Sequence, residues 1–214
     1  MSQTDRIPVL DVGPYLAGAP GARAALAEQI DRTCRDTGFL VIANHGIPQH
    51  LIDGCFAAAA SFFDRDENFK LPLKIGDLNI GYLPYGAQIV RTSRVNVNTQ
   101  PNLSESFYIV TELPQDDPRI LAGDPLYGLN KWPPGMTDFK AATLAYFTAM
   151  RPLANSMVSV IGTALGVEAD YFEKDFTAEP TATPAIESAT TATGAGRPRS
   201  EGQRNIALVP RGPL

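Results

Sequence analysis

The sequence predicts an α+β fold, in which a few short strands are separated by long helices. Two apolar runs, FLVIA at residues 39–43 and SFYIVT at residues 106–111, are rich in the β-branched and aromatic residues that favour strands. Three other stretches place apolar residues three or four positions apart, which is the spacing of one helix face. These helical ranges are 21–37, 48–64 and 137–165.

The first elements follow one another closely. Residues 7–12, IPVLDV, predict a short strand, and Pro8 is tolerable near its start. The helix at 21–37 comes next, and Gly38 is placed to end it, because glycine readily adopts the left-handed conformation found after a helix. The FLVIA run that follows is continuously apolar, which predicts a strand buried on both faces.

Two prolines bear on the later helices. Pro48 is placed at the first position of the helix that ends near Asp64, where a missing N–H is tolerated. The longest helix begins near Thr137, whose hydroxyl suits an N-cap. We expect Pro152 to kink or divide this helix, because it removes a backbone donor and crowds the preceding turn.

The composition is that of a globular protein with a mild negative charge. The 214 residues hold 18 Lys and Arg against 23 Asp and Glu, so the net charge is −5 and offers no basic surface for nucleic acid or membranes. Because there is no signal-peptide pattern and no apolar run near the roughly 18 residues that span a bilayer, we expect a cytoplasmic protein. The two cysteines, Cys34 and Cys55, form no CxxC pair and are expected to be reduced.

The composition changes sharply after residue 176. From 177 to 214, 24 of 38 residues are Ala, Thr, Pro, Gly or Ser, and none is aromatic. Such a segment buries too little apolar surface to offset the entropy of ordering it, so we predict a disordered tail. Only IALVP, near its end, has strand character.

Both histidines of the chain, His45 and His50, lie within the stretch GFLVIANHGIPQH. Two nearby imidazoles raise the question of a metal site, since histidine is the commonest metal ligand. His50 and Asp53 can share a helix face, but His45 precedes the turn and would have to fold back. We therefore expect a structural role for His45 in the NHGIP turn and a surface position for His50.

Several segments resemble one known family when they are taken in order. They are IPVLDV, GFLVIANHGIP, FFDRDENFKLPLK, GYLPYGA, NLSESFYI and GLNKWPPG, followed by the long helix up to YFEKDF. Together they resemble the N-terminal region of isopenicillin N synthase-like iron(II)- and 2-oxoglutarate-dependent dioxygenases. The nearest type is the 2-oxoglutarate-dependent ethylene- or succinate-forming oxygenases. We assign residues 1–176 to this dioxygenase N-terminal region and 177–214 to the tail.

The resemblance implies a double-stranded β-helix, or jelly roll, with flanking helices, and a small-molecule substrate. It also implies iron held by an HxD pair and a distant third histidine in the C-terminal half, with an RxS pair on 2-oxoglutarate. Three ligands on one face leave open positions for the 2-oxo acid and dioxygen. This sequence has no HxD and no histidine beyond His50, and its RxS triplet at 91–93 belongs to a different region of the match.

We therefore expect an incomplete jelly roll in which the 214 residues contain no catalytic, metal-binding or cofactor-binding residue. By region alone, five residues are expected to border the substrate mouth of related enzymes: Tyr82, Gln88, Arg91, Asn98 and Glu105.

Three functional hypotheses follow. The first is a truncated, inactive oxygenase whose tail arose from a reading-frame change. The second is a non-catalytic binding module derived from the dioxygenase scaffold, and the third is an unusual metal enzyme using His45 and His50. Because a jelly roll interleaves strands from both ends of the chain, FLVIA and FYIV would lack partners here, which predicts self-association of exposed strands.

Overall fold

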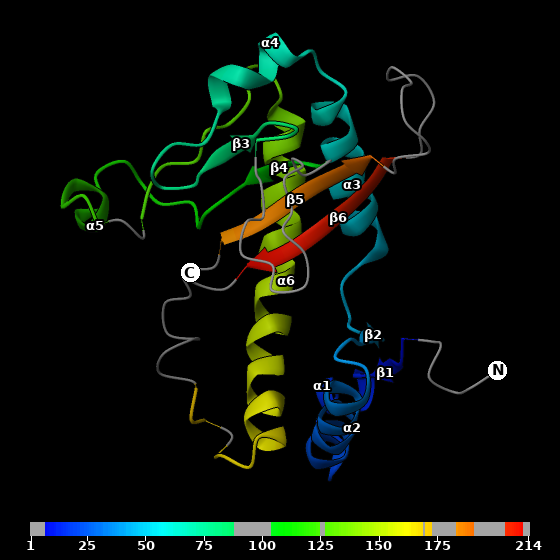
Figure 1. Cartoon of the computed structure of the whole chain (residues 1–214). Coiled ribbons are helices and arrows are strands. Elements are labelled where there is room, and N and C mark those ends of the chain that lie inside the picture. Colours follow the sequence, from blue (N-terminus) through cyan, green and yellow to red (C-terminus); the bar gives the residue numbers. More distant parts are fainter. Residues whose placement is uncertain are drawn as a thin grey trace, which may run out of the picture. The chain divides into compact units, whose positions relative to one another are not determined.

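The computed structural model describes residues 7–87, 104–124, 127–168 and 170–172, together with the backbone of two strands at 183–190 and 204–211. Figure 1 shows the helices and strands. Their order is β1 (Val9–Asp11), α1 (Gly13–Leu16), α2 (Ala22–Asp36), β2 (Val41–Ala43), α3 (Gln49–Phe63), α4 (Glu67–Lys70), the 3-10 helix η2 (Leu71–Leu73), β3 (Gly81–Leu83), β4 (Ser104–Tyr108), α5 (Pro118–Leu121), α6 (Thr137–Ala164), β5 (Thr183–Thr190) and β6 (Arg204–Arg211).

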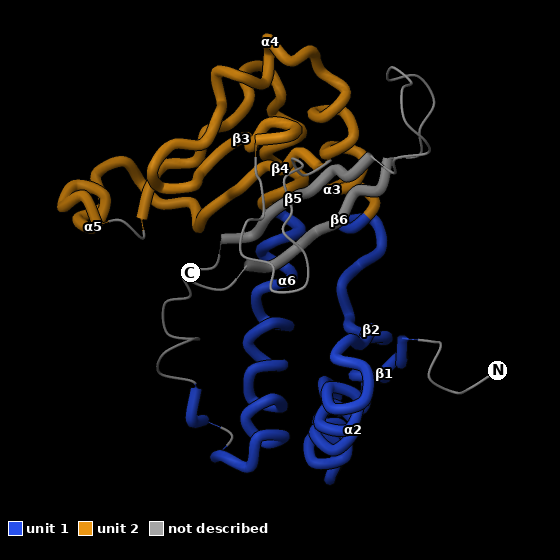
Figure 2. Tube along the Cα trace, in the orientation of Figure 1, with its two compact units in different colours: residues 1–52, 145–180 blue, residues 53–144, 181–214 orange. Residues whose placement is uncertain are grey.

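The chain divides into two compact units (Figure 2). The first comprises residues 1–52 and 145–180, and the second comprises 53–144 and 181–214. Each unit has a hydrophobic core of its own among its described residues.

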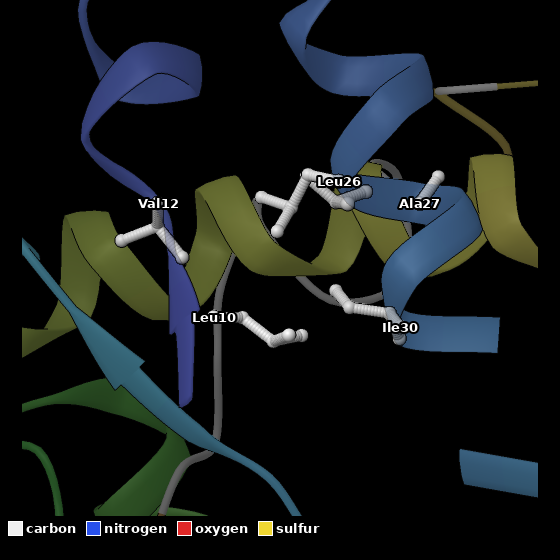
Figure 3. Packing of buried hydrophobic residues seen from close by; sticks show 6 residues of the cluster. Leu10, Val12, Leu26, Ala27 and Ile30 are labelled. Atoms are coloured by element: carbon white, nitrogen blue, oxygen red, sulfur yellow. The ribbon is translucent and has the colours of Figure 1, made fainter. Parts of the chain in front are cut away.

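The first unit is built around a short parallel sheet. β1 pairs with β2 in the register Val9↔Val41, and the Val41 N–H donates to the Pro8 carbonyl oxygen at 2.9 Å. Helix α2 ends as expected at Gly38, which has a φ of 73° and donates its N–H to the Thr33 carbonyl oxygen. The side chains in Figure 3 gather between β1, α2 and α6 and form the core: Leu10, Val12, Leu26, Ala27, Ile30 and Val160.

The second unit holds an antiparallel sheet in the order β3-β4-β5-β6 and an aromatic core. The Phe62 ring lies 4.9 Å from the Phe107 ring and 5.1 Å from the Phe139 ring, between centroids. Phe107 and Phe139 meet edge to face at 5.2 Å, an arrangement that aromatic rings favour. These rings come from α3, β4 and α6, so the core joins three segments that are far apart in the sequence.

The predicted α+β class is confirmed, and the three long helices match their predicted ranges within a few residues. Helix α6 continues from Thr137 to Ala164 with Pro152 inside it, so the proline does not divide the helix. Among the helices in the described residues, none is long and apolar enough to cross a membrane.

One expectation about strands is wrong. The FLVIA and FYIV segments do not lack partners, because β2 pairs with β1 and β4 pairs with both β3 and β5. Strands β5 and β6 also lie inside the segment whose composition predicts disorder, and their backbones pair in antiparallel register, Ile186↔Leu208 among the pairs. Such pairing is compatible with this composition because ladder hydrogen bonds are made by the backbone. Disorder of the tail as a whole stays a prediction.

Candidate functional site

A buried cluster of charged and polar groups lies in the second unit. Lys70 Nζ donates to Glu105 Oε2 at 2.6 Å and to the Phe63 carbonyl oxygen at 3.0 Å. The Tyr82 hydroxyl donates to the same Glu105 oxygen, also at 2.6 Å. Lys70, Tyr82 and Glu105 are only 1%, 2% and 6% exposed, so the cluster is shielded from water.

The local sequence explains how these groups meet. Tyr82 pairs directly with Phe107 across the β3–β4 ladder, and Glu105 is two residues before Phe107. The two side chains are therefore diagonal neighbours on one face of the sheet. Phe63 ends α3, where a carbonyl lacks an intrahelical partner, and Lys70 at the end of α4 supplies the missing donor.

The electrostatics of this cluster favour a structural role. An unpaired ammonium or carboxylate would be very costly to bury, and here the two opposite charges stabilise each other. Lys70 Nζ also lies 5.2 Å from the centroid of the Tyr82 ring, where the ring face attracts a cation. The cluster thus connects the end of α3, α4 and the β3–β4 ladder.

The five predicted mouth residues separate into two groups. Tyr82 and Glu105 are brought together in the buried cluster. Gln88, Arg91 and Asn98 lie outside the described residues. Contact of any of the five with a substrate stays a prediction.

A second polar cluster, centred on Glu112, lies at the start of α6. Lys140 Nζ donates to Glu112 Oε1 at 2.5 Å, and Asn130 Nδ2 donates to Glu112 Oε2 at 2.7 Å. The indole N–H of Trp132 donates to the same carboxylate at 3.1 Å. Burial opposes ionisation of Glu112, but these three donors together hold its pKa below the usual value.

Sequence reasoning did not single out Lys70 or Glu112. Lysine is almost never fully buried unless it is paired, so a lysine beside an apolar run gives no sign that it lies inside. The partners of Lys70 are 7 and 35 residues away along the chain, and those of Glu112 are 18 to 28 residues away.

The histidine segment forms a turn in the first unit. His45 Nδ1 accepts the Ile47 N–H at 3.1 Å, which confirms a structural role for this side chain. Asn44 has a φ of 57°, and its side chain, together with the Gly13 N–H, lowers the pKa of the Asp11 carboxyl by hydrogen bonding. His50 is exposed in the first turn of α3, as predicted.

These residues do not fit the iron centre that the resemblance implies. Among the residues that the structure describes, no group of three His, Cys, Asp or Glu side chains could hold a metal ion. His45 also uses one ring nitrogen in its own turn. A facial site needs two histidines and a carboxylate converging on one point, and His45 and His50 belong to no such group of three in the described part of the chain.

An apolar cavity of about 430 Å³ lies in the first unit. Its two polar groups do not form a reactive pair, because Asp31 accepts from Arg35 at 2.8 Å and Cys34 is a free, exposed thiol. The second free cysteine, Cys55, is buried in the other unit, and burial raises its pKa to about 11. The cavity is lined by Ile30, Asp31, Cys34, Leu40, Ile42, Met157, Ile161, Ala164 and Leu165.

Comparison with known families identifies the larger part of the chain. Residues 7–135 match the family model described as "non-haem dioxygenase in morphine synthesis N-terminal". This range includes β1, β2, the histidine turn and most of both polar clusters.

Curated relatives are similar over most of this chain. A 2-oxoglutarate-Fe(II) type oxidoreductase of Emericella nidulans, hxnY, is 30% identical over 169 residues, which cover 78% of this chain and 48% of that protein. Isopenicillin N synthase of Streptomyces microflavus is 26% identical over 178 residues, covering 82% of this chain and 52% of the synthase. The chain therefore spans about half the length of the curated relatives that it matches.

Solved structures share the fold. A full-length Neurospora crassa protein, solved in complex with alpha-KG and thymine, superposes with a TM-score of 0.67 at 21% identity and covers 86% of this chain and 55% of that one. A 2OG-Fe(II) oxygenase family protein from Caulobacter crescentus gives a TM-score of 0.68 at 17% identity, covering 88% and 57%. At these identities the likeness concerns the fold alone.

Proposed function

Because the chain belongs to the non-haem dioxygenase N-terminal family, we propose that it forms the N-terminal half of an iron(II)- and 2-oxoglutarate-dependent oxygenase acting on a small molecule, and that these 214 residues do not make the iron site. The coverage of the relatives supports the first part of this proposal. For each of the two curated relatives, about four fifths of this chain aligns with about half of the relative.

The histidine turn is the observation that supports the second part. The two histidines of the sequence lie five residues apart, and one of them is bonded to its own turn through Nδ1. Iron ligation by His45 would have to break that bond and bring His45, His50 and a carboxylate together, and the described residues contain no such group. Oxidation would therefore need ligands from outside these 214 residues.

Within the proposed oxygenase half, Tyr82 and Glu105 act as positioning residues. Tyr82 lies in β3, the last strand before the segment 88–103, and Glu105 lies in β4, the first strand after it. Their bonds to each other and to Lys70 fix the register of the two strands that flank this segment. The segment holds Gln88, Arg91 and Asn98, the three remaining candidates for the substrate mouth.

The proposal is tested by incubating the purified chain with Fe(II), ascorbate, 2-oxoglutarate and dioxygen, and measuring succinate. The Neurospora crassa protein, solved with alpha-KG and thymine, serves as the positive control, with thymine added to its reaction. We expect succinate from the control and none above background from this chain. Catalytic turnover that is lost in the His45→Ala or His50→Ala variant would overturn the proposal and revive the hypothesis of an unusual metal enzyme.

A second candidate function is a non-catalytic binding module. It is favoured by the Lys70–Glu105–Tyr82 cluster, whose charges are satisfied by each other without any cofactor. A module predicts that the immobilised chain retains one dedicated partner, whereas an inactive incomplete copy predicts that it retains none. A pull-down followed by mass spectrometry distinguishes the two.

A further inference from the structure

The turn that joins β2 to α3 contains the partly buried side chain of His45. Its Nδ1 atom accepts the Ile47 N–H at 3.1 Å. A ring nitrogen accepts a hydrogen bond only while it carries no proton, whereas both nitrogens of a charged imidazolium are donors. This turn therefore requires the neutral form of His45, with the ring proton on Nε2.

The backbone of the turn is in a conformation that needs support. Asn44 has a φ of 57° and Gly46 has a φ of 74°, so the residues on both sides of His45 are left-handed. Asparagine adopts this conformation more readily than most residues with a side chain, but it still costs free energy. The bond from Ile47 to His45 spans Gly46, and so it stabilises the turn in this conformation.

A second side-chain hydrogen bond attaches the turn to β1. The Asn44 side chain bonds to the Asp11 carboxylate, which also accepts the Gly13 N–H at 2.9 Å. Because these bonds lower the pKa of Asp11, its carboxylate stays ionised as the pH falls from 8 to 5. The attachment to β1 is therefore constant over the range in which an imidazole ordinarily takes up a proton.

The elements beside the turn carry few other groups that titrate in this range. Besides Asp11 of β1, α1 contributes Tyr15, whose hydroxyl donates to the Ser156 carbonyl oxygen at 3.0 Å. Strand β2 has no titratable side chain, and α3 contributes His50 and Asp53, which are both exposed. Histidine is the one side chain that ordinarily changes its charge between pH 5 and 8, so His50 is the natural control.

We propose that His45 makes residues 44–47 an acid-sensitive turn, which its Nδ1 bond closes at neutral pH and which opens when the imidazole is protonated. A proton taken up from solvent at Nδ1 converts this acceptor into a donor that faces the Ile47 N–H, so the bond breaks. The change loosens the link between β2 and α3, and it does not depend on the proposed oxygenase function.

The first test follows the wild-type chain by NMR from pH 8 to pH 5. Long-range proton–nitrogen correlations of the two histidine rings show which nitrogen carries a proton, and the Ile47 amide reports the bond. We expect Nδ1 of His45 to be unprotonated at neutral pH, and the Ile47 amide shift to move with the same midpoint as the His45 ring.

Hydrogen exchange of the Ile47 amide gives the size of the effect. We expect its protection, relative to an unstructured peptide at the same pH, to fall by about fivefold on acidification, as for the loss of one ordinary hydrogen bond. An Ile47 amide that keeps its shift and its protection at pH 5, or a His45 Nδ1 that is already protonated at neutral pH, overturns the proposal. These measurements need no variant and do not depend on how a substitution affects folding.

Two matched variants then assign the response to one histidine. His45→Asn removes the titrating group but keeps an acceptor, because an asparagine side chain can accept the N–H two residues further on. We expect Ile47 to be equally protected at both ends of the pH range in this variant. His50→Gln, the control, should respond as the wild type does. A response that persists in His45→Asn, or disappears in His50→Gln, overturns the proposal.

Discussion

Lys70 shows at the scale of a single residue how pairing permits burial. Its ammonium group is 1% exposed and would be prohibitively costly there without Glu105 and the Phe63 carbonyl oxygen. Glu105 depends equally on Lys70, because Tyr82 supplies a hydrogen bond but no charge. The energy of the cluster is therefore shared, and removing either charge should expose the cost of burying the other.

Lys70→Met is expected to destabilise the chain strongly. Methionine fills a similar space, but it leaves the Glu105 carboxylate buried without a cation and the Phe63 carbonyl without its donor. We expect the free energy of unfolding, measured with urea, to fall by about 3–5 kcal/mol. The control is Lys140→Met, which breaks a partly exposed ion pair with Glu112 and should cost about 1 kcal/mol or less. Similar losses for the two variants would contradict the account.

At the scale of elements, each end of a strand or helix depends on a small number of backbone and side-chain contacts. Strand β3 begins at Gly81, which has a φ of 108° and passes close to the Leu73 carbonyl oxygen. Helix α6 begins beside Glu112, which binds Lys140 in its first turn and also Asn130 and Trp132.

Gly81→Ala should weaken the second unit. A Cβ at this position would lie 2.3 Å from the Leu73 carbonyl oxygen, and its backbone angle is unfavourable for any residue with a side chain. We expect a loss of about 3 kcal/mol or more in the free energy of unfolding. In Gly54→Ala, inside α3, the added Cβ meets nothing within 4 Å, so this control should stabilise by about 0.5–1 kcal/mol. Equal effects would contradict the tight contact at β3.

The Glu112 cluster should make stability depend on pH. The folded chain lowers the pKa of Glu112 below 4.5, so its contribution is present above pH 4.5 and is lost as pH falls through the lower folded value. The difference in unfolding free energy between the wild type and Glu112→Gln should therefore shrink on acidification from neutral pH to below 4.5. A difference that stays constant across this range would contradict the assigned cluster. The difference in unfolding free energy between the wild type and Glu112→Gln should be modest, because the Glu112 carboxylate is partly exposed.

At the scale of the whole molecule, local sequence patterns predict the positions of the helices better than they predict the long-range contacts. Periodicity locates α2, α3 and α6, and the short motifs identify the family and the structural role of His45. Tyr82 and Glu105 are singled out by region only. Their diagonal pairing and their bond to Lys70 depend on strand register and on contacts across 35 residues, which no local pattern encodes.

Local sequence patterns also do not predict which strands pair with each other. The apolar run FLVIA correctly predicts a strand, yet one face of β2 is exposed, because its partner β1 covers an edge and not a face. β5 and β6 lie in sequence of low hydrophobicity, where alternation is weak and the pairing is a property of the backbone. Self-association stays a prediction, although the FLVIA and FYIV strands both have partners.

The most direct test of the central claim is the stoichiometry of Fe(II) bound to the purified chain under anaerobic conditions with 2-oxoglutarate. Equilibrium dialysis followed by elemental analysis measures it, with the Neurospora crassa protein that was solved with alpha-KG as the control. The account predicts about one iron per control molecule and far less than one per molecule of this chain. Binding of one iron per chain that is abolished in His45→Ala or His50→Ala would contradict it.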